Sequence, residues 1–347
     1  MPQKTSQKTS LKTTSSFSIG IDLGGTKVAA ALVDAKGGIV SESVRPTVPP
    51  YLHGQDPRNT KTTSARDVRE HIQYVIGSIA DATIELFDSV PGSVAKNLAG
   101  IGLASAGPMN LGRGSLDYPS NFKGWKVVPL VELLSEALEQ RGLKLRKGHG
   151  IFFQNDAMAA ALGEGWVGSA KGCKTFAVVT VGTGIGTGVI FNGQPAQSTG
   201  MGSEWGHMLV NCAGLTDDGE DLEFRTVEGH ASGTWLIRRA QARGFRGANA
   251  ADLAEAAKMG DKIAKEAFLG ASEALAALLF SLSLGFHPEK FVVSGGMLAI
   301  KEMFLPQTIE LYRKLIKQKG PQFLAPVQVA KLGIKSGVIG AARLPWL

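Results

Sequence analysis

The sequence predicts an α/β protein, and three observations indicate this class. Short apolar runs such as GIDL, GIGLAS and FAVVTV have the length of strands, and each leads into a glycine-rich break. Segments with helical periodicity separate these runs, which is the order of an α/β fold. The 347 residues are 44% apolar and 19% charged, enough to form two domains with cores of their own.

The first third of the chain predicts a hairpin, a loop and a helix. Residues 17–22 form a strand, a glycine turn follows, and the strand in KVAAALVDAKGGIV turns again at Gly37 and Gly38. Residues 45–63 are rich in Pro and Thr and predict a loop. From Ser64, a plausible N-cap, apolar residues recur at helical spacing to Leu86. We expect this helix to cover one face of the first sheet.

The remaining elements alternate in the same way. LAGIGLAS is a buried strand, and VPLVELLSEALEQRG is a helix with Pro129 near its start and Gly142 past its end. GIFFQNDAMAAALGEGW is a strand that breaks into an alanine-rich helix, and TFAVVTVGTGIGTGVIFNG is a strand, a glycine turn and a strand. Helical patterns dominate 232–286. The strand KFVVS, a strand near PVQVAKLG and a helix near SGVIGAARL complete the chain.

Composition excludes several classes of protein. No apolar run reaches the roughly 18 residues of a membrane span, and the N-terminus lacks the apolar core of a secretion signal, so we expect a cytoplasmic protein without membrane contact. Cys173 and Cys212 are too few for a disulfide framework and are predicted to be free thiols. Three lysines of the polar segment 1–16, a predicted disordered tail, reduce the net charge of +7 to +4 for the rest, so no nucleic-acid partner is expected.

Three glycine-rich breaks follow apolar strands, at residues 22–27, 180–188 and 294–296. Glycine at such turns lets backbone N–H groups face a phosphate without a Cβ in the way, although an ordinary hairpin turn would show the same residues. The dinucleotide-binding motif Gly-x-Gly-x-x-Gly would need glycine at position 187 or 189, where the sequence has Thr187 and Val189. A P-loop would need Lys and then Ser or Thr after its last glycine, where the sequence has Pro108 and Met109. The three breaks together favour a nucleotide or phosphate site of another kind.

The motifs GIDLGGTK, GLASAGPMN, NFKGW, QNDAMAAALGE, VTVGTGIGTGVI, GSEWGHMLV, VEGHASG and VVSGGM follow in this order from about Ser18 to Gly296. Together they resemble the ROK family of bacterial sugar kinases and sugar-responsive repressors. The resemblance implies an actin-like ATPase (ribonuclease H-like) fold, with two α/β domains around a cleft that closes on the sugar. It also implies that Asp22 helps to hold Mg²⁺ through water. The implied ATP-binding residues are Gly24, Gly25, Thr26, Lys27, Thr183, Gly184, Gly295 and Gly296.

The resemblance assigns the catalytic role to Asp156, because phosphoryl transfer to an alcohol needs a carboxylate that accepts the hydroxyl proton. On its own, Asn155-Asp156 before an alanine-rich helix is a typical helix cap. The residues implied to bind sugar hydroxyls are Asn121, Asn155, Asp156, Glu204, His207 and Glu228. His207 in isolation is a structural histidine, and Trp125 is predicted to pack in the core.

One departure from the family pattern is large. Many members follow the histidine with three cysteines that bind a structural zinc ion with it, whereas HMLVNCAGLTDDGEDLEFRTVEGH holds Cys212 alone. Because such a tetrahedral site requires several soft ligands, we expect no zinc site here. What then orients His207 is left open.

The sequence thus predicts an ATP-dependent hexokinase acting at the 6-hydroxyl, with glucose as the leading substrate. Fructose, mannose, N-acetylmannosamine and N-acetylglucosamine are alternatives, as are polyphosphate as donor and a non-catalytic regulator of the same family. The predicted domains are 17–154, joined by the C-terminal helix 333–347, and 155–332. The expected partners are a small-molecule sugar and ATP, with a homodimer possible by resemblance.

Overall fold

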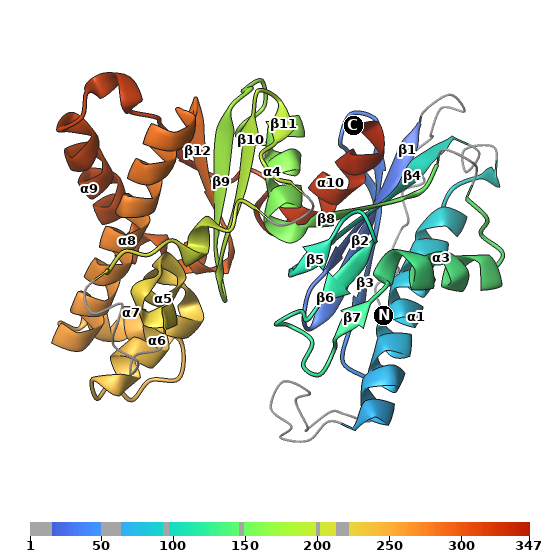
Figure 1. Cartoon of the computed structure of the whole chain (residues 1–347), viewed down its shortest axis with the longest axis horizontal. Helices are drawn as coiled ribbons and strands as arrows, with labels where there is room; N and C mark the ends of the chain where they lie inside the picture. The colour runs from blue at the N-terminus through green and yellow to red at the C-terminus, as the bar shows by residue number, and fades with distance from the viewer. Residues whose placement is uncertain (1–15, 50–63, 93–96, 146–148, 199–201, 213–221) are drawn as a thin grey trace, which may run out of the picture. The chain divides into compact units, whose positions relative to one another are not determined.

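Two five-stranded sheets organise the computed structural model of the chain (Figure 1). The structure describes residues 16–49, 64–92, 97–145, 149–198, 202–212 and 222–347, so the predicted tail lies outside them except for its last residue. Contacts divide the chain into unit 1 (Met1–Pro108, Arg113–Gln154 and Ala341–Leu347) and unit 2 (Met109–Gly112 and Asn155–Gly340).

The sheet of unit 1 has the order β3-β2-β1-β4-β8. β1 pairs antiparallel with β2 and parallel with β4, and β2 pairs antiparallel with β3. The predicted hairpin is therefore confirmed, and a crossover returns the chain to the side of β1. The strands are β1 (Phe17–Leu23), β2 (Lys27–Asp34), β3 (Ile39–Pro46), β4 (Leu98–Ser105) and β8 (Ile151–Asn155), with the short β6 (Ser115–Asp117) and β7 (Val127–Val128) paired apart from them.

The predicted first helix is α1 (Ala65–Asp88), and it packs on β2 and β3 as expected. Ser64 caps it, because the Ser64 hydroxyl accepts a hydrogen bond from Asp67 N while the Asp67 carboxylate accepts one from Ser64 N. α3 (Leu130–Gln140) packs against α1.

The prediction of a loop from residue 45 was wrong at its start. Arg45 and Pro46 continue β3, where Arg45 lies opposite Val28 of β2. The Arg45 guanidinium also contacts the carboxylate of Glu85 on α1 at 2.9 Å. Cross-strand pairing and this ion pair extend the strand into a stretch whose composition indicates a loop. Residues 50–63 lie outside the part of the chain that the structure describes.

Unit 2 repeats the strand arrangement of unit 1 in the order β11-β10-β9-β12-β13. β9 pairs antiparallel with β10 and parallel with β12. The second and third predicted glycine breaks thus begin at the ends of neighbouring parallel strands. The strands are β9 (Phe176–Val181), β10 (Ile185–Phe191), β11 (Gln194–Pro195), β12 (Lys290–Ser294) and β13 (Val327–Val329); β5 (Met109–Asn110) is assigned to this unit.

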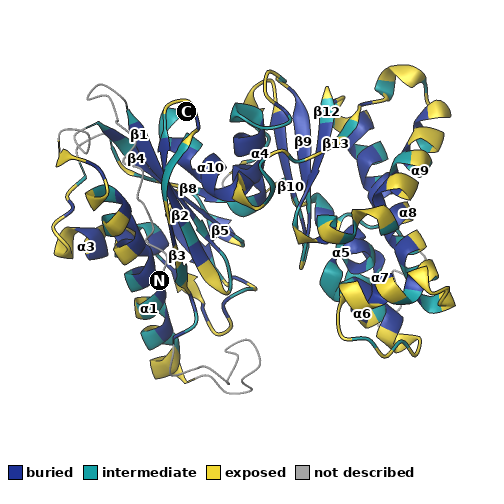
Figure 2. Ribbon diagram, turned by 180° about the vertical axis from the view of Figure 1, so that it is seen from behind, coloured by how far each residue is buried: buried dark blue, intermediate teal, exposed yellow. Residues whose placement is uncertain are grey.

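Helices enclose the core of unit 2, and most residues of the strands β9, β10 and β12 are buried (Figure 2). α4 packs on β9 and β10, and α8 contacts α5, α6, α7 and α9. By length and composition α8 would suffice to cross a membrane, but more than half of its apolar window is buried, as in a core helix. The helices are α4 (Asp156–Trp166), α5 (Val227–Ala231), α6 (Gly233–Ala242), α7 (Ala250–Lys258), α8 (Lys262–Phe286) and α9 (Leu305–Lys317).

The last helix, α10 (Ser336–Arg343), begins in unit 2 and ends in unit 1. Within unit 2 it packs so closely on α4 that a Cβ at Gly340 would overlap the carbonyl group of Ala159. A Cβ at Gly163 of α4 would lie 2.5 Å from Ser336 O. Glycine at both positions is therefore required by the close approach of the two helices.

Candidate active site

Asp156 lies where β8 ends and α4 begins. The N-cap of α4 is Asn155, whose Oδ1 accepts hydrogen bonds from Ala157 N at 2.9 Å and Met158 N at 3.2 Å. The capping function suggested for this pair therefore belongs to Asn155, and Asp156 is the acidic residue of the first turn. Any contact of Asn155 to a sugar would come from its amide nitrogen, because its oxygen serves the cap.

The carboxyl group of Asp156 is buried and hydrogen-bonded to the backbone. Burial raises the pKa of Asp156, and a hydrogen bond from Ala157 N at 2.8 Å opposes part of that rise. A carboxylate with a raised pKa is a stronger base, and the backbone N–H keeps it oriented. This is the combination that a general base for a hydroxyl requires.

Three other predicted sugar-binding residues, Asp156, His207 and Glu228, lie within electrostatic reach of Glu204. The pKa of Glu204 is raised by burial and, to a smaller extent, by the negative charges of Asp156 and Glu228, whereas His207 lowers it. Glu204 precedes the short 3-10 helix η2 (Trp205–His207), and Glu228 lies in the first turn of α5. We call Asp156, Glu204, His207 and Glu228 the carboxylate–histidine cluster.

The second glycine break touches this cluster. Glu228 Oε2 accepts a hydrogen bond from Ile185 N at 2.7 Å, at the start of β10. A Cβ at Gly184 would lie 2.7 Å from the same oxygen. Glycine at 184 therefore lets a predicted sugar-binding carboxylate lie directly against the predicted phosphate turn.

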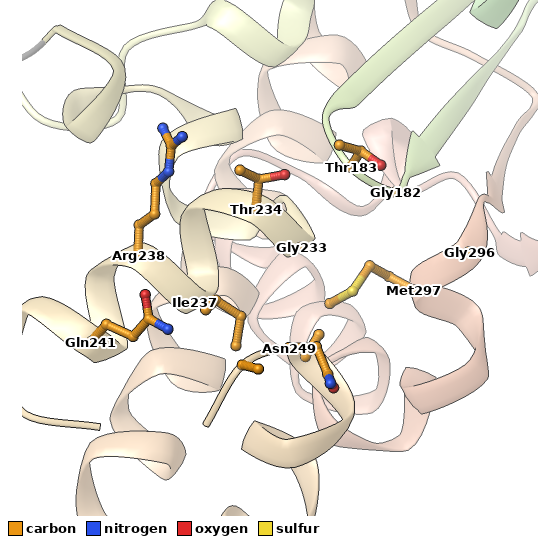
Figure 3. Close-up of a pocket in the computed structure, with 12 residues that line it drawn as sticks. Gly182, Thr183, Gly233, Thr234, Ile237, Arg238, Gln241, Asn249, Gly296 and Met297 are labelled. Carbon is orange, nitrogen blue, oxygen red and sulfur yellow. The ribbon is translucent and has the colours of Figure 1, made fainter. Parts of the chain in front are cut away.

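A pocket of about 560 Å³ is lined in part by the same turn, at Gly182 and Thr183 (Figure 3). Thr183 from the β9–β10 turn and Gly296 from the third break line it together, so two of the three predicted breaks meet in unit 2. Gly295, in contrast, has φ +101° and packs against Val181 of β9. Its role is to place the neighbouring Gly296 at the pocket wall.

One wall of the pocket was not predicted from the sequence. α6 contributes Thr234, Arg238 and Gln241, whose side chains are drawn in Figure 3, and Asn249 lies at the start of α7. The Arg238 guanidinium lies over the Trp235 ring, 4.8 Å from its centroid. These residue types are ordinary for an exposed helix face, so the available signal was only their position after the SGTW turn.

The first glycine break lies in unit 1, beside Asn121. Gly24 N donates to Lys27 O at 3.0 Å and closes the turn, which leaves Thr26 and Lys27 exposed. A Cβ at Gly25 would lie 3.4 Å from that of Asn121. Asp22 is half-buried near the end of β1. The phosphate turn and one predicted sugar residue are thus brought together here.

A buried aromatic group fixes the loop that carries Asn121. Phe122 and Trp125 stack with centroids 4.4 Å apart, which confirms the core position of Trp125. Trp125 Nε1 donates to His71 Nδ1 at 3.3 Å, and His71 Nε2 bonds to Thr47 O at 2.9 Å. Burial lowers the pKa of His71, so it is held neutral. Because Thr47 N donates to Thr26 O, the same chain of bonds reaches the phosphate turn.

Comparison with known proteins identifies the family. A family model described as "ROK family" matches residues 18–345. The chain belongs to the ROK family. It is 28% identical to a glucokinase of Thermotoga maritima, with 94% of this chain and 96% of the relative covered. The predicted family is therefore confirmed.

Solved structures of ROK proteins share the fold. A ROK hexokinase of Thermus thermophilus matches with a TM-score of 0.71 and 28% identity, covering 94% of this chain and 96% of that one. A ROK glucokinase of Streptomyces griseus in complex with glucose and AMPPNP matches with a TM-score of 0.64 and 28% identity, covering 94% and 98%. The expected actin-like ATPase fold is confirmed.

The donor set of this chain does not fit the zinc site of many ROK proteins. Between His207 and Glu228, Cys212 is the only thiol in the sequence, and it is exposed. Among the residues that the structure describes, no group of three or more His, Cys, Asp or Glu could hold a metal ion. A tetrahedral zinc site needs four ligands, so no step below passes through zinc.

Proposed function

We propose that this protein transfers the γ-phosphoryl group of ATP to the 6-hydroxyl of a hexose, with glucose as the leading substrate. The chain is an ATP-dependent sugar kinase of the ROK family, similar over nearly its whole length to glucokinases and a hexokinase. The choice of hexose and of hydroxyl is the proposal. The observation that carries it is the carboxylate–histidine cluster, in which one basic carboxylate lies among polar groups suited to hydroxyls.

The donor nucleotide would occupy the pocket of unit 2. Backbone N–H groups of the turn at Gly182 and Thr183 would bind phosphate oxygens, and Arg238 would supply positive charge from the opposite wall. The adenosine would lie toward Gly296 and Met297. In support, the Streptomyces griseus relative binds AMPPNP, an ATP analogue.

Unit 1 would contribute the residues of the first glycine break. We propose that Gly24, Gly25, Thr26 and Lys27 contact phosphate and that Asp22 holds Mg²⁺ through water. A carboxylate oxygen at the end of a strand, next to a tight turn with exposed backbone, fits the preference of Mg²⁺ for hard oxygen ligands. When bound, the ion would neutralise phosphate charge.

Asp156 would act as the general base. Its carboxylate would accept the proton of the sugar hydroxyl while that oxygen forms the new bond to phosphorus. The raised pKa makes the carboxylate a better proton acceptor, and the Ala157 N–H stabilises its charged form. Water must be excluded during this step, since it competes for the phosphoryl group.

The other predicted residues would recognise the sugar. Glu204 and Glu228 can accept hydrogen bonds from hydroxyls, and the amides of Asn121 and Asn155 can donate them. A site of this kind rejects sugars whose hydroxyls leave these groups unpaired. A kanosamine kinase of Amycolatopsis mediterranei (26% identity) and a fructokinase of Zymomonas mobilis (27% identity) are also relatives, which favours other hexoses as the second candidate.

A coupled ADP-release assay tests the proposal, with ATP or polyphosphate as donor and a panel of hexoses as acceptor. We expect glucose with ATP to give the highest kcat/KM. Asp156→Asn should lower kcat by about 10²- to 10⁴-fold while the sugar still binds in calorimetry. Asp67→Asn is a matched control, because Asp67 is also a first-turn aspartate, on α1. Unchanged turnover in Asp156→Asn would remove Asp156 from the base role, and sugar binding without turnover in the wild type would support the non-catalytic regulator.

We further propose that the enzyme is cytoplasmic and forms a homodimer, as ROK proteins commonly do. Sedimentation of the purified chain tests the second point, and a monomer at micromolar concentration would refute it.

A further inference from the structure

His207 has a carboxylate beside its ring. His207 Nδ1 lies 3.4 Å from Glu223 Oε1. Glu223 belongs to the 3-10 helix η3 (Leu222–Arg225), which comes before α5 in the chain. His207 itself is joined to Glu204 by a backbone hydrogen bond from His207 N to Glu204 O at 3.1 Å. The His207 ring is therefore next to the Glu223 carboxylate, and the His207 backbone is bonded to that of Glu204, a member of the carboxylate–histidine cluster.

Glu223 is held in place by Thr226. The Thr226 hydroxyl lies 2.9 Å from Glu223 O and 3.2 Å from Glu223 Oε2, and it accepts a hydrogen bond from Gly229 N at 3.0 Å. Thr226 is also the N-cap of α5, the helix that carries Glu228. The carboxylate beside His207 is thus tied to the same local structure as a second predicted sugar residue.

Backbone pairing joins the segment after His207 to the segment after Glu223. Leu209 and Thr226 form an antiparallel bridge. Val227 N donates to Met208 O at 3.0 Å, and Val210 N donates to Arg225 O at 2.8 Å. These bonds fix the two segments to each other.

A side-chain anchor holds this pair of segments on α6. The Phe224 ring packs edge-on against Trp235 with centroids 5.1 Å apart. Arg239 Nη1 donates to Phe224 O at 2.8 Å, and its guanidinium lies 5.5 Å from the Phe224 ring centroid. Because Phe224 directly follows Glu223, the anchor limits movement of the carboxylate relative to the core.

We propose that Glu223 is a positioning residue for sugar binding, which orients His207 in the role that zinc has in many ROK proteins. This inference rests on the proposed function and on the prediction from the sequence that His207 binds a sugar hydroxyl. A carboxylate at Nδ1 keeps the proton on Nδ1 and leaves the lone pair on Nε2. His207 Nε2 then accepts a hydrogen bond from a sugar hydroxyl, and the Glu223 carboxylate makes that nitrogen a better acceptor.

A double-mutant cycle tests the inference on the full-length enzyme. The variants are Glu223→Ala, His207→Ala and the double variant, with Glu273→Ala as a matched control because Glu273 is an exposed glutamate on α8. We expect Glu223→Ala to raise the KM for the hexose by about 10- to 100-fold, with the KM for ATP within about twofold of wild type. In the His207→Ala background the same change should have less than a threefold effect. Equal effects in both backgrounds would overturn the inference.

The tautomer of His207 gives a readout that a structural role would not move, and it needs no variant of Glu223. Long-range ¹H–¹⁵N spectra of the wild type, with His207 assigned by the loss of its signals in His207→Ala, should show the proton on Nδ1 and not on Nε2. The opposite tautomer would refute the proposal even if Glu223→Ala failed to fold.

The outcomes also separate the inference from the proposed function. If the wild type phosphorylates no hexose, the proposed function fails, while the tautomer still decides the contact between Glu223 and His207. If the wild type is active and the cycle is additive, the function stands and the positioning role of Glu223 fails.

Discussion

Replacing Gly184 with alanine would test the link between the glycine turn and the carboxylate–histidine cluster. The new Cβ would lie 2.7 Å from Glu228 Oε2, closer than real Cβ contacts come, and 3.3 Å from Glu228 Cδ, which is a tight contact. The end of a glutamate side chain can move, so the steric cost itself is small. The movement, however, breaks the 2.7 Å hydrogen bond from Ile185 N to the carboxylate. A hydrogen bond to a charged group is worth about 1.5–3 kcal/mol.

The free energy of unfolding should therefore fall by about 1.5–3 kcal/mol, which corresponds to a melting temperature lower by about 3–10 °C. The KM for the hexose should also rise, since Glu228 leaves its position. Gly182→Ala is the matched control for stability on the same turn, because the nearest atom to its Cβ is Gly296 N at 4.0 Å. Differential scanning fluorimetry and the coupled assay measure both effects. Wild-type stability and hexose KM in Gly184→Ala would refute the reasoning.

Three further predictions concern the pH dependence of kcat, the pH dependence of stability and the effect of a metal chelator. Because burial raises the pKa of Asp156 and the base acts ionised, kcat should fall as the pH drops through a value above the ordinary aspartate pKa; a flat acid limb would contradict this. The lowered pKa of His71 means that its contribution to stability is full above about pH 6.5 and is lost as the pH falls toward the folded-state pKa. His71→Phe should lower the free energy of unfolding by about 1–3 kcal/mol at pH 7.5 and should reduce its dependence on pH, both measured by urea unfolding. An unchanged pH dependence of the free energy of unfolding would exclude His71 as its source. Treatment with the zinc chelator 1,10-phenanthroline, followed by addition of Mg²⁺, should leave the KM for the hexose unchanged. A rise in this KM that added zinc reverses would show a metal at His207.

Much of the fold follows from local features of the sequence. The strand, glycine turn and strand around Gly24, the capping of α1 by Ser64 and the corner at Asn155 depend on residues close in the chain, and each is in the structure as predicted. Identification of the family also followed from motif order, because eight motifs in one order are far more specific than any one of them. The extension of β3 to Pro46 was missed, since pairing with β2 overrides a composition typical of loops.

The parts of the site that the sequence did not reveal arise from tertiary packing. Arg238 and Gln241 line the pocket of unit 2 because α6 turns that face toward the β9–β10 turn, yet their spacing is that of any amphipathic helix. Glu223 meets His207 across a bridge between distant segments, and no motif marks it. The missing cysteines left open which group orients the histidine, and the contact with Glu223, on which our proposal rests, appears only in the structure.

The most direct test of the central claim is a crystal structure of the enzyme with glucose and a non-hydrolysable ATP analogue. A carboxylate oxygen of Asp156 should lie within about 2.6–3.2 Å of the 6-hydroxyl, with the γ-phosphate of the analogue facing that oxygen. A glucose molecule bound with its 6-hydroxyl out of reach of Asp156 would contradict the account.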